Sequence, residues 1–230
     1  DKYTFAFNEL KGVLGLNKDI KKIEAYDVSH ISGDHAVASC VVFSNLGALK
    51  KDYRLFNIPE TLSGNDVGSL QHVLERRIKY YENPKIKPDV ILIDGGRNQL
   101  NFTQSVIDSS EYDDIKIISI VKGSNRVRAT ETILSNDGII ELEKYSKAYL
   151  LLQEMRDESH RFAITAQRKK KRGNIKQSRL DQINGIGDVL KKRLILKFKN
   201  IQNIKDANIE DLMTVRGINA KIAKSIKEKI

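Results

Sequence analysis

The chain of 230 residues has one cysteine, three prolines and no long hydrophobic run. Because Cys40 has no second cysteine to pair with, an intrachain disulfide is excluded and nothing points to an oxidising compartment. The longest apolar runs, such as residues 117–121, fall far short of the roughly 20 residues that a membrane-spanning helix needs. No signal-peptide pattern opens the sequence. These absences predict a cytoplasmic protein with no membrane partner.

The first residue is Asp1 rather than a methionine, and we expect the chain to be part of a longer protein whose upstream modules are missing. A length of 230 residues allows one domain of ordinary size and a second, small one. The hydrophobic fraction of 40% is that of a globular protein.

Charge is distributed unevenly along the chain, whose net charge is +10. Residues 1–167 hold 22 Lys and Arg against 24 Asp and Glu, whereas residues 168–230 hold 18 against 6. This separation favours a tail that binds a polyanion and a front part whose function requires acids. A tail that only increases solubility is the alternative.

The front part predicts a residual linker over residues 1–22 and an α/β domain over 23–167. Within the domain, runs rich in Val, Ile, Phe and Tyr predict strands, and apolar residues at i, i+3 and i+4 predict helices. The predicted strands cover residues 22–28, 36–44, 49–58, 90–93 and 115–121, with a hairpin at 130–142, and the predicted helices cover 66–81, 98–109 and 145–165. A meander, a helix and then a βαβ unit predict a ribonuclease H-like mixed sheet flanked by helices.

The tail predicts a small all-α domain over residues 179–230, joined by a basic linker over 168–178 that also touches phosphate. Two similar segments, Ile-Asn-Gly-Ile-Gly at 183–187 and Val-Arg-Gly-Ile-Asn at 215–219, lie 32 residues apart. A duplicated unit of this size predicts a tandem helix-hairpin-helix arrangement.

Two acids stand where predicted strands end, at the positions of the catalytic acids in ribonuclease H-like domains. Asp27 closes an apolar run, Asp94 closes another before a Gly-Gly turn, and His160 lies in a predicted helix. If the three side chains converge, they would suit Mg²⁺ or Mn²⁺, because these cations prefer oxygen ligands. Such an ion supports phosphodiester hydrolysis, since it activates water and stabilises the leaving oxygen.

Each of these residues also has an ordinary structural interpretation. An Asp before a turn, such as Asp94, often satisfies loop amides, and Asp66 is predicted to be the N-cap of its helix. His160 has charged neighbours, as is typical of a solvated helix face. Its possible roles are metal ligand, water-orienting group and general base. The other histidines are expected to be ordinary; they are His30, His35 and His72.

The two Gly-containing hairpins predict binding to the phosphates of duplex DNA. Gly185, Gly187 and Gly217 are expected to allow positive φ, so that amides of the next helix face a phosphate. Asn219 replaces the second glycine in the second copy, which keeps the hairpin with weaker phosphate binding because Asn tolerates the left-handed conformation. A helix stop and start without a ligand is the alternative.

Further side chains around the hairpins are expected to support this binding. Ile186 and Ile218 anchor each hairpin in the core. Basic side chains that add charge are Lys191, Lys192, Arg193, Lys221 and Lys224. Contacts of this kind hold a duplex without reading its sequence.

Four segments carry a resemblance to a known family. They are Ile-Glu-Ala-Tyr-Asp-Val-Ser-His at 23–30, Asp-Tyr-Arg-Leu-Phe-Asn-Ile at 52–58, Leu-Ile-Asp-Gly-Gly-Arg-Asn-Gln-Leu at 92–100 and Arg-Asp-Glu-Ser-His-Arg-Phe-Ala-Ile at 156–164. In their order and spacing the chain resembles the C-terminal half of UvrC proteins, incision subunits of the bacterial excinuclease of nucleotide excision repair. The sequence of residues 123–130 departs from the family pattern.

The resemblance implies an endonuclease that makes the incision on the 5′ side of a lesion in double-stranded DNA. It implies a metal held by Asp27, Asp94 and His160, with Asp66 as a further acid. It also implies a GIY-YIG nuclease for the 3′ incision and a UvrB-binding region, neither of which lies in this chain. UvrB and the UvrA-loaded complex would thus be partners through regions mostly missing here.

Two other functions remain open at this point. One is a different ribonuclease H-like nuclease, such as an endonuclease V-like enzyme, which would not be expected to carry paired hairpins. The other is a DNA-binding or scaffold module whose nuclease core is inert.

Overall fold

The computed structural model describes residues 2–29, 36–122 and 131–230. Its two compact units are Asp1–Ala166 and Gln167–Ile230. In the described ranges, no helix combines the length and the apolar character needed to cross a membrane. Residues 123–130, whose sequence departs from the family pattern, lie outside the described residues, as do His30 and His35.

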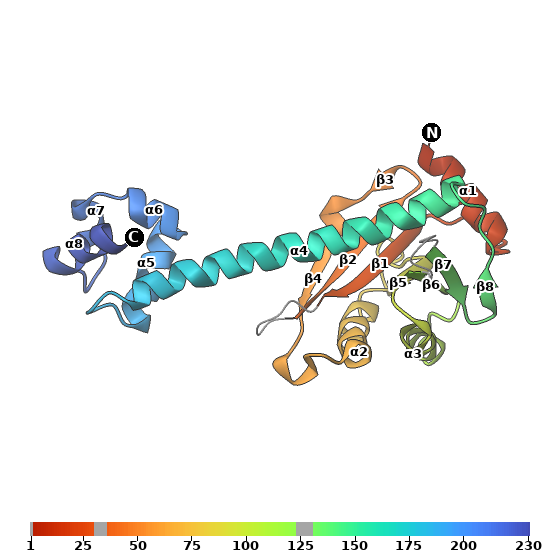
Figure 1. Cartoon of the computed structure of the whole chain (residues 1–230), viewed down its shortest axis with the longest axis horizontal. Coiled ribbons are helices and arrows are strands. Elements are labelled where there is room, and N and C mark those ends of the chain that lie inside the picture. The colour runs from red at the N-terminus through yellow and green to blue at the C-terminus, as the bar shows by residue number, and fades with distance from the viewer. Residues whose placement is uncertain (1, 30–35, 123–130) are drawn as a thin grey trace. The chain divides into compact units, whose positions relative to one another are not determined.

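The first unit is built on one mixed sheet (Figure 1). Its strands are β1 (Lys22–Ser29), β2 (Val37–Ser44), β3 (Gly47–Ala48), β4 (Arg54–Asn57), β5 (Val90–Asp94), β6 (Lys116–Lys122), β7 (Glu131–Ser135) and β8 (Gly138–Ile140). They lie in the order β3-β2-β1-β5-β6-β7-β8, and β4 also pairs with β2. The pairs β1–β5 and β5–β6 are parallel, and the other pairs are antiparallel.

The apolar character of β5 explains its central place in the sheet. Val90, Ile91, Leu92 and Ile93 are all buried, as is typical of a parallel strand covered on both faces. The expected meander, the βαβ unit and the hairpin at β7–β8 are present, which confirms the predicted fold class. The predicted strand 49–58 is shorter, because a 3₁₀ turn, η1 (Lys50–Asp52), separates β3 from β4.

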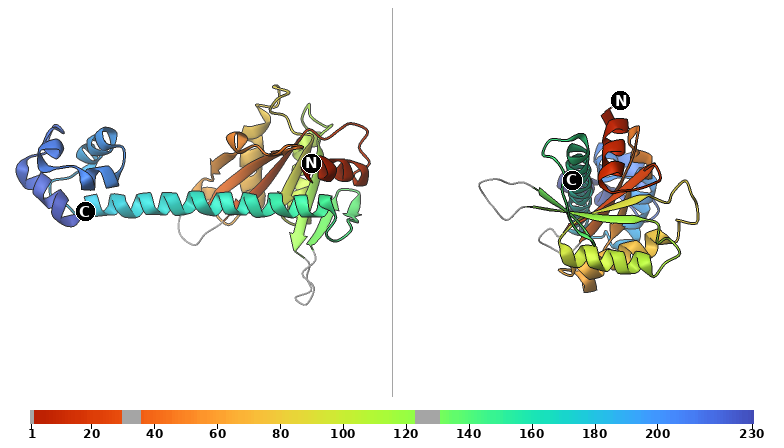
Figure 2. Two further views of the ribbon diagram at one scale, coloured as in Figure 1. Left: turned by 90° about the horizontal axis from the view of Figure 1, so that it is seen from above. Right: turned by 90° about the vertical axis from the view of Figure 1, so that its right-hand side faces the viewer.

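Helices cover both faces of the sheet (Figure 2). These helices are α1 (Lys2–Val13), α2 (Asp66–Ile78), α3 (Arg97–Asp108) and α4 (Lys147–Asp181), and a short 3₁₀ turn, η2 (Glu60–Leu62), precedes α2. In the first unit, α1 and α4 lie on one face and α2 and α3 on the other. The amide of Ala148 donates to Glu9 Oε2 at 2.6 Å, and Tyr3 Oη donates to Glu154 Oε1 at 2.7 Å, so α1 is joined to α4 by hydrogen bonds.

The structure differs from the predicted linkers. Residues 1–22 include α1, whose Phe7 and Leu10 are buried in the core of the first unit. The sequence of α1 does not reveal this, because the surface that covers its apolar side comes from distant segments. The basic segment 168–178 is helical and belongs to α4, since Lys and Arg are good helix formers and do not interrupt a helix.

The second unit is all helical, as predicted for a tandem helix-hairpin-helix domain. After the end of α4 it contains α5 (Asp188–Phe198), α6 (Ile201–Asp206), α7 (Ile209–Met213) and α8 (Ala220–Lys229). A separate apolar core holds the helices together, and its members include Leu180, Ile183, Ile186, Leu194, Ile204, Leu212, Val215, Ile218, Ala223 and Ile226. Equivalent positions of the two repeats therefore contribute to one core.

The packing of α1 predicts that two phenylalanines of this helix contribute very differently to the free energy of unfolding. Phe7 is 2% exposed and Phe5 is 67% exposed. We expect Phe7→Ala to lower the free energy of unfolding by about 3–5 kcal/mol, because it leaves a cavity in the core. Phe5→Ala is the matched control and should change it by less than about 0.5 kcal/mol. Urea unfolding of both variants measures this, and equal effects would show that α1 does not belong to the core.

Candidate active site

Asp27 and Asp94 are brought together by the pairing of β1 with β5. The parallel register aligns Tyr26 with Ile93, and the next residue on each strand is an aspartate. Because the carboxyl ends of neighbouring parallel strands meet at the same edge of a sheet, both side chains lie at one edge. The sequence positions of the two acids thus become spatial neighbours.

His160 reaches the same place from α4. Its Nδ1 shares a hydrogen bond with Asp27 Oδ2 at 3.0 Å, and Ser29 Oγ donates to the same oxygen at 2.7 Å. Ser39 Oγ on β2 donates to the carbonyl of Ser159 at 2.8 Å, which fixes α4 over the sheet next to His160. The Asp27 side chain is 8% exposed and the imidazole is 58% exposed, so the carboxylate is shielded while the imidazole is open to solvent.

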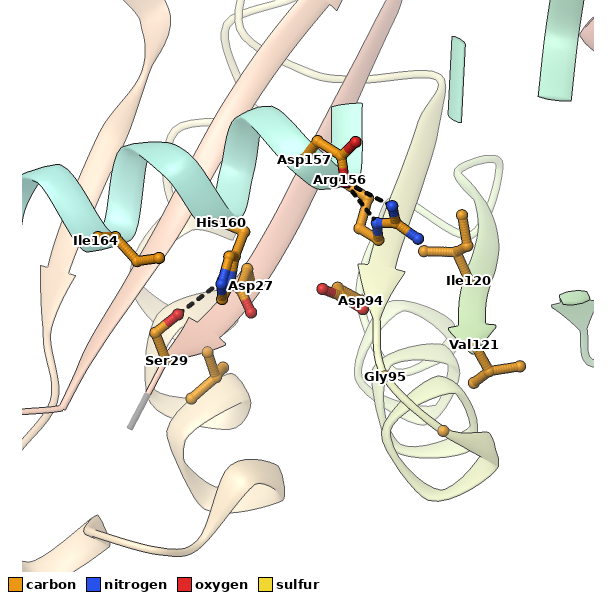
Figure 3. A pocket seen from close by; sticks show the side chains of 12 residues that line it. Asp27, Ser29, Asp94, Gly95, Ile120, Val121, Arg156, Asp157, His160 and Ile164 are labelled. Carbon is orange, nitrogen blue, oxygen red and sulfur yellow. Dashed lines mark hydrogen bonds and ion pairs between the residues drawn. The ribbon is translucent and has the colours of Figure 1, made fainter. Parts of the chain in front are cut away.

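Asp27, Asp94 and His160 line one pocket of about 600 Å³ (Figure 3). Arg156 and Asp157 line it too, and Arg156 lies four residues before His160 and therefore on the same side of α4. The structure brings Asp27, Asp94 and His160 together, as their sequence positions predict. Sequence reasoning missed Arg156 and Asp157, although their spacings of four and three residues to His160 were an available signal.

Asp66 lies elsewhere. It is exposed and lines a neighbouring pocket of about 530 Å³ between the starts of α2 and α3, together with Arg97 and Asn98. The predicted N-cap is also corrected: Asn65 Oδ1 accepts the amide of Gly68 at 2.9 Å, and Asp66 is the first residue of the helix. The structure therefore does not bring Asp66 to the pocket of the other acids.

The two carboxylates in the pocket suit a hard divalent cation, because carboxylate oxygens are typical ligands of Mg²⁺ and Mn²⁺. Asp27, Asp94 and His160 would hold such an ion. As placed, His160 is hydrogen-bonded to Asp27, and in the part of the chain that the structure describes no three His, Cys, Asp or Glu side chains are arranged to hold a metal. The chemistry of the donor set fits a metal.

On the other face of β1, a buried polar network supports the strand that carries Asp27. Glu24 is fully buried and accepts hydrogen bonds from Tyr26 Oη at 2.6 Å, from Tyr81 Oη at 2.7 Å and from Arg77 Nε at 3.0 Å. Burial raises the pKa of both tyrosines well above the ordinary value, so both phenols stay protonated and donate. Burial alone would lower the pKa of Arg77, but the charge of Glu24 raises it.

In the second unit, the two hairpins have the same backbone geometry. Gly185 and Gly217 have φ of 96° and 101°, a conformation that favours glycine. Gly187 and Asn219 have extended backbones, with φ of −91° and −101°, and each is the N-cap of the following helix. The expectation of positive φ at Gly187 and of a left-handed Asn219 is therefore wrong. Asn219 replaces glycine as a cap, since its Oδ1 accepts the amide of Ile222 at 2.9 Å.

The side chains around the hairpins are not equivalent. Ile186 and Ile218 are buried, as expected of anchors. Lys192, Arg193, Lys221 and Lys224 are exposed. Lys191 is only 15% exposed and lies 3.9 Å from Asp188, whose own side chain is 93% exposed in the first turn of α5. The first turn of α8 contains no acid. The two hairpins thus differ in that an acid lies at the start of α5 and none lies at the start of α8.

Comparison with known proteins agrees with both units. The model of the family "UvrC RNAse H endonuclease domain" matches residues 11–164. The chain belongs to the UvrC family. A second family model, "SAM-like Helix-hairpin-helix tandem", matches residues 178–230.

Curated UvrC relatives match along almost the whole chain. UvrABC system protein C of Legionella pneumophila (strain Paris) is 36% identical over 224 residues, which are 96% of this chain and 36% of the relative. The protein of the same name from Pseudomonas putida (strain KT2440) is 38% identical over 223 residues, or 96% of this chain and 37% of the relative. The chain thus spans a little over a third of the length of these relatives. Among solved structures, that of human ENDOV is 13% identical in sequence. The match covers 64% of this chain and 86% of the ENDOV chain, with a TM-score of 0.37.

The network below β1 predicts different roles for two neighbouring arginines. Arg77→Met should lower the free energy of unfolding by about 3–5 kcal/mol, because it leaves Glu24 buried without its ion pair. Arg76 is exposed on the same helix, and Arg76→Met is the matched control with an expected change below about 0.5 kcal/mol. Urea unfolding of the two variants measures the difference. A stable Arg77→Met protein would show that Glu24 does not depend on this partner.

Proposed function

We propose that this chain is a divalent-metal-dependent endodeoxyribonuclease that makes the 5′ incision in nucleotide excision repair. The proposal rests on one observation above all, the convergence of Asp27, Asp94 and His160 in a single pocket at the edge of the sheet. The family model of an RNase H endonuclease domain over residues 11–164 supports a nuclease. The ion is proposed to be Mg²⁺ or Mn²⁺.

The residues of the pocket have distinct proposed roles. Asp27 and Asp94 hold the ion, which when bound makes water nucleophilic and stabilises the leaving oxygen. The hydrogen bond between His160 and Asp27 fixes the direction of the imidazole ring, so that the ring is oriented before the substrate arrives. His160 then acts as a ligand or as the group that takes a proton from the attacking water.

The tandem hairpins are proposed to hold double-stranded damaged DNA through its phosphates. Amides at the starts of α5 and α8 and the exposed side chains of Lys192, Lys221 and Lys224 supply positive charge. Relatives of the chain carry the name UvrABC system protein C, and we propose UvrB and the UvrA-loaded complex as partners, mostly through regions outside this chain.

The nuclease proposal predicts the effect of removing either acid. Asp27→Asn and Asp94→Asn should each lower the rate of incision by roughly 100-fold or more, because each removes a charged ligand of the ion. Binding of duplex DNA should stay within about twofold, since the hairpins remain intact. Gel assays of a 5′-labelled duplex with one bulky lesion measure incision, and fluorescence anisotropy measures binding.

The matched control is Asp113→Asn, which removes an exposed acid outside the pocket and should cut at the normal rate. Incision that survives in Asp27→Asn or Asp94→Asn would rule out the proposed site. Calorimetric titration with Mn²⁺ separates the enzyme from an inert scaffold, because only the enzyme retains a metal site that the two substitutions abolish. Preference for a deaminated base over a bulky lesion would instead indicate an endonuclease V-like enzyme.

The unequal hairpins predict changes of opposite sign in DNA binding. The double variant Lys221→Gln/Lys224→Gln should bind more weakly and lower the salt slope of log K by roughly 1.8, because two phosphate contacts are lost. Asp188→Asn should bind several-fold more tightly, since an acid at the start of α5 repels a phosphate there. Anisotropy titrations over a range of salt concentrations measure both effects.

Lys205→Gln is the control, because Lys205 is an exposed lysine of α6, outside both hairpins. It should lower the salt slope by much less than the double variant. An unchanged slope in the double variant would contradict the role of the second hairpin.

A further inference from the structure

Arg156 is the one cationic side chain among the described residues that line the catalytic pocket, apart from the titratable His160. Three carboxylates line the same pocket, those of Asp27, Asp94 and Asp157. A guanidinium at this place can either contact the DNA phosphate or organise the protein around the acids. The contacts of Arg156 decide between these roles.

The guanidinium is already occupied by carboxylates of the protein. Its Nε and Nη2 donate to Asp157 Oδ1 at 2.9 and 2.5 Å, and its Nη1 forms an ion pair with Glu131 Oε1. The side chains of Arg156 and Glu131 are only 14% and 10% exposed, whereas that of Asp157 is 68% exposed. The pair with Glu131 is therefore the shielded one, and it leaves little of the guanidinium for a substrate.

Glu131 links the turn of α4 that contains Arg156 to the part of the sheet that lies beyond Asp94 as seen from β1. It is the first residue of β7, which pairs with β6, and β6 aligns Ile120 with Asp94 of β5. On the other side of Asp94, His160 is hydrogen-bonded to Asp27 on β1. In the strand order β1-β5-β6-β7, the two links lie on either side of Asp94.

We propose that Arg156 is a positioning residue: its ion pair with Glu131 holds the turn of α4 that carries His160 above the two acids. This inference rests on the proposed nuclease function. Without the pair, α4 loses its link to β7. The turn that carries His160 is then held to the sheet by the hydrogen bond of His160 to Asp27 and by that of Ser39 to the carbonyl of Ser159. Arg156 acts through the protein and does not touch the DNA.

The test is a double-mutant cycle with Arg156→Met, Glu131→Gln and the combined variant in the whole 230-residue chain. Each single substitution should lower kcat for incision by roughly 10- to 100-fold, because a small displacement of a catalytic group has effects of this size. KM for the DNA should stay within about twofold. The combined variant should be no slower than either single variant, since both remove the same link.

Three additions make the cycle decisive. Arg161→Met is the matched control. Arg161 is on the same helix and forms an ion pair with Glu158, but it does not line the catalytic pocket. The kcat of this variant should therefore be unchanged. Arg156→Lys retains a charge without the planar fork and should fall between wild type and Arg156→Met. Circular dichroism and thermal melting establish that each assayed variant is folded. If Arg156→Met does not fold, Arg156→Lys takes its place in the cycle.

A second readout does not depend on cutting. The ring ¹⁵N resonances of His160 in the NMR spectrum should move in Arg156→Met, Arg156→Lys and Glu131→Gln, and should stay in place in Arg161→Met. If the wild-type chain does not cut DNA, the proposed function fails, while these resonances still test the positioning role.

Several results would overturn the inference. Full activity in Glu131→Gln together with loss in Arg156→Met would assign the arginine to the DNA itself, as would a rise in KM with constant kcat. Additive losses in the combined variant would show two independent roles. Unmoved His160 resonances in folded Arg156→Lys and Glu131→Gln would show that the ion pair does not position the imidazole.

Discussion

The edge of the sheet that carries Asp27 and Asp94 depends on the register of β1 against β5. Side chains alternate between the two faces of a strand, so a shift of β1 by one residue would turn Asp27 away from α4 and toward α2 and α3. The register is fixed because both faces are buried: β5 is apolar on either side, and β1 has Ile23 and Ala25 on one face and Glu24 and Tyr26 on the other. The position of Asp27 next to Asp94 is thus a consequence of core packing.

The buried charge of Glu24 makes this register still more specific. A carboxylate in the core is costly unless it is paired and hydrogen-bonded, and here Arg77, Tyr26 and Tyr81 satisfy it. A shifted strand would bring Glu24 to the side of α1 and α4, away from all three partners. One face of β1 therefore holds the strand in place by charge pairing, and the other presents Asp27 to the pocket.

Local patterns predicted most of the fold, and long-range partners explain the rest. The apolar run that ends in Asp94 and the duplicated Gly-Ile motif each contain their own signal within a few residues. The burial of Phe7, the ion pair of Arg156 with Glu131 and the separation of Asp66 from the other acids depend on segments far apart in sequence, which no local periodicity encodes. The expected positive φ of Gly187 is wrong because this glycine is an N-cap with extended backbone, and the pattern Gly-Ile-Gly does not distinguish the two conformations.

Cys40 lies on β2, where it is aligned with Tyr26 on one side and Arg54 on the other, and it is fully buried. Burial raises the pKa of its thiol well above the usual value. In the folded sheet the sulfur is therefore both inaccessible and protonated, and alkylating reagents do not react with it. Because it is the single cysteine of the chain, any alkylation reports an opening of this strand. The rate of labelling would thus give the local opening equilibrium at the middle of the sheet, without an introduced probe.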